Sequence, residues 1–152
     1  MSDLADKKCI PCEGGIPGFN IGEIHKYLKM VDGWEVKADE SNIYYLIKEF
    51  KFKNFLESQN FVNKVGEIAE IEGHHPDIWF GWGYAKIKIF THAIKGLHES
   101  DFILAAKVDK ISKSLKCLVF EKAKTVLVLF ANLIISLSFT DPNGCIIAET
   151  PA

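Results

Sequence analysis

A short window of the chain holds most of the side chains that could exchange protons near neutral pH. Four of the five histidines lie between the acidic residues Glu70 and Asp101, and three of these, His74, His75 and His92, are the candidates for a common site. Imidazole is the side chain whose ordinary pKa lies closest to neutrality, so several histidines gathered in one pocket suit general acid–base catalysis.

Aromatic residues in the same window indicate the shape of a possible ligand. Trp79 and Trp82 follow His75 within a few residues. Flat aromatic walls beside proton donors and acceptors would suit a planar heteroaromatic ligand.

Two other interpretations of the histidines stay open. Three neutral imidazoles are also a ligand set for catalytic zinc, although His74 and His75 are adjacent, and neighbours in an extended segment point apart. In a purely structural interpretation, His74 and His75 cap the end of a helix and His92 ends a strand.

Capping signals predict the helix that carries the first histidines. Asn54 with Glu57 forms a capping-box pattern, and apolar residues at helical spacing continue to about Gly73. If the helical period persisted, Glu70 and His74 would share one face, where the carboxylate could orient or charge the imidazole.

Similar signals predict a helix on either side of that one. Asn20 with Glu23 starts a short helix that Gly33 would stop, and apolar residues from Leu104 to Leu115 mark the last helix. Asp101 lies near the first turn of the last helix, where a purely structural role for its charge is to stabilise the helix N-terminus.

Two hairpins are expected between these helices. Residues 34–37 and 43–52 flank a turn-rich segment, and alternating residues from Ile78 to Tyr84 and over 86–92 predict two more strands. Glycines inside the first of the latter strands indicate a bulge or a close approach by a backbone or ligand. The order α-β-β-α-β-β-α predicts an α+β fold, a four-stranded antiparallel sheet with three helices packed on one face.

Composition excludes several classes of partner. The 152 residues carry a formal charge of −2 with scattered lysines, which argues against nucleic acid. The chain begins with a polar stretch, so no signal peptide is expected, and four cysteines are too few for a disulfide framework. These features favour the cytoplasm.

Residues 1–19 predict an extended N-terminal arm. It contains a CxxC pair, Cys9 and Cys12, followed by glycines and prolines. Zinc needs four ligands and the chain has no second CxxC, so we interpret the pair as two thiols in an arm.

Residues 115–152 form a C-terminal extension of unknown role. Its run from Thr125 to Phe139 is almost wholly apolar, but it is shorter than the roughly 20 residues that span a bilayer. A buried or partner-facing segment is therefore expected at 125–139 in preference to membrane contact.

The pattern Glu70-x-x-x-His74-His75-Pro76, an aromatic strand, Thr91-His92, Gly96-Leu97 and Asp101 closely resembles the signature of the pterin-4a-carbinolamine dehydratases. The resemblance covers roughly residues 20–112, within an expected domain of residues 20–114. It implies a hydro-lyase that dehydrates 4a-hydroxytetrahydrobiopterin to quinonoid dihydropterin and water, in tetrahydrobiopterin recycling.

The resemblance also implies which residues act. It implies a reaction that needs no metal and no organic cofactor, and a protein that assembles as a homodimer or homotetramer. The implied catalytic set is His74, His75, His92 and Glu70. The implied substrate-binding set is Gly73, His74, His75, Pro76, Phe90, Thr91, His92, Ala93 and Asp101.

Some positions depart from the family pattern. The position before the paired histidines is Gly73, and Phe90 and Ala93 flank Thr91-His92 where more polar residues are expected, so pterin contacts there would be made mainly by backbone. A rival function is a non-catalytic pterin-binding or dimerisation module that assists a regulator or a molybdopterin enzyme.

Overall fold

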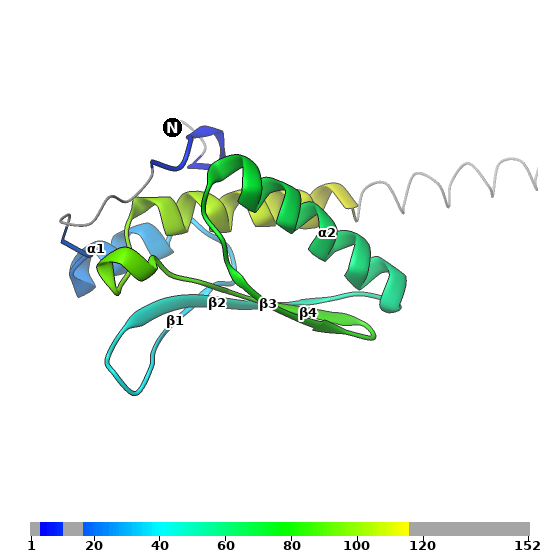
Figure 1. Cartoon of the computed structure of the whole chain (residues 1–152), viewed down its shortest axis with the longest axis horizontal. Coiled ribbons are helices and arrows are strands. Elements are labelled where there is room, and N and C mark those ends of the chain that lie inside the picture. Colours follow the sequence, from blue (N-terminus) through cyan, green and yellow to red (C-terminus); the bar gives the residue numbers. More distant parts are fainter. Residues whose placement is uncertain (1–3, 11–16, 116–152) are drawn as a thin grey trace, which may run out of the picture. The chain divides into compact units, whose positions relative to one another are not determined.

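The computed structural model describes residues 4–10 and 17–115. Helices α1 (Ile21–Leu28) and α2 (Phe55–Glu72) and a further helix over residues 99–115 lie on one face of a four-stranded sheet (Figure 1). This arrangement confirms the predicted α+β fold. Cys12 and the apolar run 125–139 lie outside the described residues.

The sheet is antiparallel, with strand order β1-β2-β4-β3. Its strands are β1 (Glu35–Ala38), β2 (Tyr44–Lys51), β3 (Asp77–Gly81) and β4 (Tyr84–Ile89). Alternate residues of the two central strands are buried under the helices, as expected for a sheet covered on one side. These core residues are Leu46, Phe50, Ala85, Ile87 and Ile89.

The hairpin between β3 and β4 corrects one prediction. The alternation from Ile78 to Tyr84 predicted one continuous strand, but the chain reverses at Trp82 and Gly83, and Gly81 pairs with Tyr84. Gly83 has a positive φ of 79°, and a Cβ there would lie 3.3 Å from the Phe52 carbonyl oxygen. The close backbone approach inferred from the glycines is thus confirmed at Gly83.

The helix starts agree with the capping patterns to different degrees. The Asn20–Glu23 capping box is complete, although α1 ends at Leu28, before the predicted stop at Gly33. At α2 the Asn54 side chain accepts from the Glu57 amide, but the Glu57 carboxylate accepts from the Lys53 amide instead of completing a box. The Asn54 backbone is more extended than that of Asn20, with φ of −157° against −73°. This difference in φ changes the direction of the Asn54 amide relative to the helix, and the Glu57 carboxylate accepts from Lys53 instead.

Gly73 ends α2 and redirects the chain toward the histidines. It adopts the left-handed conformation, with φ 62°, and the His74 amide donates to the Ala69 carbonyl at 3.1 Å. This bond closes the helix end and takes His74 out of the helical period.

Within residues 4–10 and 17–115, no helix is long and apolar enough to cross a membrane.

Replacing Gly73 tests the importance of this turn. We expect Gly73→Ala to lower the free energy of unfolding by about 1 kcal/mol, because the Cβ of alanine makes the positive φ unfavourable. A Cβ at Gly73 would meet no neighbour within 4 Å, so no clash adds to this effect. Urea unfolding measures it.

Gly66, inside α2, is the matched control, since a Cβ there also meets no neighbour within 4 Å. Gly66→Ala should raise the unfolding free energy by about 1 kcal/mol through helix propensity. Stabilisation by both substitutions would contradict the account of Gly73.

Candidate active site

The centre of the site is a hydrogen bond between His74 and Asp101. His74 Nε2 lies 2.8 Å from Asp101 Oδ1, and the carboxylate side chain is fully buried. Because a carboxylate accepts, Nε2 carries the proton in this bond. Proton exchange with a ligand is therefore left to Nδ1.

Asp101 also accepts two further kinds of donor. The Thr91 hydroxyl donates to both carboxylate oxygens, at 3.2 and 3.0 Å, and the His98 amide donates to Oδ2 at 2.7 Å. His74 lies in the segment after α2, Thr91 lies in the segment after β4, and His98 directly precedes helix 99–115. The Asp101 carboxylate therefore joins these three parts of the chain. Asp101 thus does more than stabilise a helix N-terminus.

The predicted pairing of Glu70 with His74 is wrong. Glu70 Oε1 instead lies 3.0 Å from Nε2 of His75, and both side chains are largely exposed, at 80% and 60%. The physical reason is the left-handed turn at Gly73, which moves His74 inward to Asp101 and leaves His75 on the Glu70 side. The two adjacent histidines therefore have separate carboxylate partners.

His92 is positioned by an aromatic contact. It is exposed at the start of the 3₁₀ turn η2 (His92–Ile94), and its ring centroid lies 4.1 Å from that of Phe90. The Lys88 ammonium lies over the same Phe90 ring at 4.7 Å and over the Tyr45 ring at 4.6 Å. Lys88 and Tyr45 were not among the predicted site residues; the alternation of the strand places Lys88 and Phe90 on one face but gives no signal for Tyr45.

The remaining predicted residues surround these groups in different ways. Pro76 leads directly into β3, where Asp77 forms an ion pair with Lys88 at 3.8 Å, and Ala93 is exposed in η2. Trp79 is half exposed on β3, but Trp82 lies in the turn at the far end of that strand. The aromatic residue in contact with a site histidine is Phe90, so Trp82 does not form the predicted flat wall.

The described residues contain no group of three or more His, Cys, Asp or Glu side chains arranged to hold a metal ion. Instead, Asp101 and Glu70 hold His74 and His75 separately.

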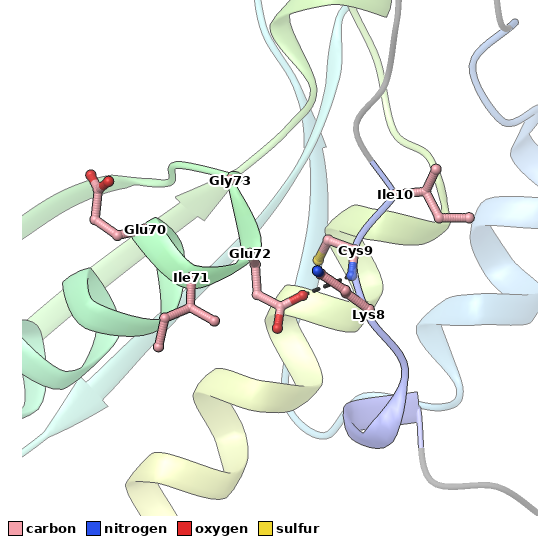
Figure 2. A pocket seen from close by; sticks show the side chains of 7 residues that line it. All are labelled: Lys8, Cys9, Ile10, Glu70, Ile71, Glu72 and Gly73. Carbon is pink, nitrogen blue, oxygen red and sulfur yellow. Dashed lines mark hydrogen bonds between the residues drawn. The ribbon is translucent and has the colours of Figure 1, made fainter.

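A depression of about 480 Å³ lies where the arm meets the C-terminal end of α2, and it shares Glu70 and Gly73 with the candidate site (Figure 2). Its lining residues are Lys8, Cys9, Ile10, Glu70, Ile71, Glu72 and Gly73. None of the three site histidines lines it. We therefore do not assign it as the catalytic pocket.

Cys9 beside this depression has the properties of a packing residue. Its thiol is buried and donates to the Ser100 carbonyl oxygen at 3.5 Å. Burial, followed by the nearby Glu72 carboxylate, raises the pKa of Cys9 to about 12. Such a thiol is a poor nucleophile and a poor metal ligand at neutral pH.

The Cys9 thiol should therefore resist alkylation in the folded chain. At pH 8, iodoacetamide should modify it at least about 100-fold more slowly than in the urea-unfolded chain, as followed by mass spectrometry of the Cys9 peptide. Equal rates in the folded and unfolded chains would contradict the buried environment.

Known proteins resemble this chain over the region that carries the site. The model of the family described as "Pterin 4 alpha carbinolamine dehydratase" matches residues 18–111. A protein of Rubrobacter xylanophilus is 52% identical over 111 residues, which cover 73% of this chain and 100% of that protein. A protein of Methylococcus capsulatus is 50% identical over 109 residues, covering 72% and 93%. Both bear the name "Putative pterin-4-alpha-carbinolamine dehydratase".

A solved structure has the same fold. It is described as a transcriptional coactivator/pterin dehydratase from Brucella melitensis, with a TM-score of 0.56 and 25% sequence identity, over 62% of this chain and 98% of the other. The family match and the two close relatives together confirm the resemblance that the histidine pattern carried. The chain belongs to the pterin-4a-carbinolamine dehydratase family.

Proposed function

We propose that this protein dehydrates a 4a-hydroxytetrahydropterin to the quinonoid dihydropterin by histidine acid–base catalysis. The observation that carries the proposal is the 2.8 Å contact between His74 and the fully buried Asp101, in a chain that belongs to this family. A buried carboxylate that fixes one imidazole nitrogen leaves the other free to exchange a proton in a defined direction.

The reaction needs one proton donor and one proton acceptor. The C4a–O bond breaks with its electron pair on oxygen, and a proton from the donor allows that oxygen to leave as water. The acceptor removes the proton from the adjacent ring nitrogen, and the electron pair of that N–H bond forms the new C=N bond. Neither step requires a metal or an organic cofactor.

We assign the donor to His74 and the acceptor to His92. The buried Asp101 carboxylate fixes the His74 ring in one orientation, whereas His92 is exposed and contacts the Phe90 ring at a tilted angle. A fixed ring can direct its proton at the leaving hydroxyl, and an exposed ring can reach the ring nitrogen of a bound pterin.

The exposed pair of Glu70 and His75 suits substrate binding better than proton transfer. In this proposal His75 holds the pterin, Glu70 orients His75, and backbone groups of Gly73, Phe90 and Ala93 complete the contacts. The natural substrate is a pterin, proposed from the family, with 4a-hydroxytetrahydrobiopterin as the compound to test first. Assembly as a homodimer or homotetramer is part of the same proposal.

Substituting the two catalytic histidines tests the assignment. His74→Ala and His92→Ala should each lower kcat for dehydration by about 100-fold or more, because each removes a general acid or base. Stopped-flow absorbance with freshly generated carbinolamine measures the rate.

His25, exposed on α1, is the matched control, and His25→Ala should leave kcat unchanged. Wild-type kcat in either His74→Ala or His92→Ala would remove that histidine from the mechanism.

Asp101→Asn should lower kcat by about 100-fold, because an amide cannot accept from all of the donors that meet the carboxylate. The unpaired donors should also lower the unfolding free energy by about 1–3 kcal/mol. Both quantities are measured on the same preparation.

Asp109 provides the control for loss of a buried aspartate on the same helix. It accepts from Trp34 Nε1 at 3.2 Å and pairs with Lys48 at 2.7 Å. Asp109→Asn should destabilise the fold without changing kcat of the folded protein. An equal loss of kcat in both variants would reduce Asp101 to a structural residue.

A second candidate is a binding module that acts without catalysis. The observation that favours it is the similarity to the Brucella melitensis protein, which is described as a transcriptional coactivator as well as a pterin dehydratase. A wild-type protein that binds a pterin but leaves the dehydration rate at its uncatalysed value would favour this candidate.

A further inference from the structure

The last residue of α2, Glu72, joins three parts of the chain. Its Oε2 accepts from the Cys9 amide at 2.7 Å, and its Oε1 pairs with the Lys107 ammonium on helix 99–115. The Glu72 side chain is 7% exposed and points toward Cys9, whereas Glu70 points away from the arm (Figure 2). A single buried carboxylate thus ties the arm, α2 and helix 99–115 together.

Ser100 makes a second connection between the arm and helix 99–115. The Ile10 amide donates to Ser100 Oγ at 3.3 Å, and Ser100 Oγ lies 3.0 Å from the Ile10 carbonyl, to which it donates. The Cys9 thiol donates to the Ser100 carbonyl. Ser100 is itself buried and directly precedes Asp101.

Two exposed ion pairs flank these buried contacts. Lys7 pairs with Glu99 at 2.6 Å, and Asp6 pairs with Lys110 at 2.7 Å. Exposed pairs contribute little to stability, so Glu72 and Ser100 make the polar contacts that matter most for holding the arm. Leu4, Ala5 and Cys9 of the arm also pack into the hydrophobic core.

We propose that residues 4–10 are a strap that positions the His74–Asp101 pair, with Glu72 as its main positioning residue. His74 follows Glu72 by two positions and Asp101 follows Ser100 by one, so the strap holds both ends of the catalytic hydrogen bond. Small displacements of a catalytic group cost large factors in rate, which gives this restraint its effect. The effect on catalysis rests on the proposed function, whereas the effect on His74 geometry does not.

The charge of Glu72 persists at neutral pH. Burial acts to raise the pKa of Glu72, but the Cys9 amide and the Lys107 ammonium outweigh it, and the net pKa is below the ordinary 4.5. The three-way contact is therefore present above that pH and is lost as the pH falls through the lowered value.

Glu72→Gln in the full chain tests the strap, because glutamine keeps the size of the side chain but removes the charge that pairs with Lys107. We expect kcat for dehydration to fall about tenfold with KM within about twofold, since the substituted residue positions catalytic groups without touching substrate. The ¹⁵N signals of the His74 ring should lose the signature of a proton fixed on Nε2.

Glu72→Gln removes the partner of the Lys107 ammonium, and this variant could fold poorly for that reason. Ser100→Ala is therefore the second variant, because it removes only neutral hydrogen bonds to the arm. It should shift the same His74 signals. Glu35→Gln is the control, because it removes an exposed ion pair with Lys37 on β1 and should change neither kcat nor the His74 spectrum.

The two readouts separate the strap from the proposed function. If the wild type has no dehydratase activity, altered His74 signals in Glu72→Gln and Ser100→Ala still support the strap. The proposal is overturned if both folded variants keep the wild-type His74 signals, whatever their unfolding free energies.

Discussion

The buried carboxylate of Asp101 is the interaction on which the rest of the site depends. It receives donors from His74, Thr91 and the His98 amide, which come from the segment after α2, the end of the sheet and the start of helix 99–115. A buried carboxylate is costly unless hydrogen bonds compensate it, so the three segments cannot separate without exposing an unpaired group. The same constraint that stabilises this corner of the fold fixes the orientation of the His74 ring.

The left-handed turn at Gly73 makes this arrangement possible. A helix that continued through His74 would place its ring beside Glu70, and Asp101 would lose its imidazole partner. Ending the helix there sends successive histidines to different carboxylates, one buried and one exposed. One residue thus separates the environment of the proposed proton donor, His74, from that of His75, which we propose holds the ligand. The contacts of Glu72 lie directly before that turn.

Much of the fold could be predicted because its signals are local. The capping residues Asn20 and Asn54 and the alternation of β2 and β4 specify their elements within a few residues. The pairing of His74 with Asp101 could not be predicted, because it depends on a change of chain direction and a contact between distant segments. The turn at Trp82 was missed because aromatic alternation continues through it, and Glu72 gave no signal because its partners lie on two other elements.

The most direct test of the central claim is the rate of carbinolamine dehydration by the purified wild-type chain, measured against the uncatalysed rate with a metal chelator present. If His74 and His92 carry both proton transfers, the wild-type chain should give a clear acceleration that the chelator does not reduce. A rate equal to the uncatalysed one, or an acceleration abolished by the chelator, would contradict the claim.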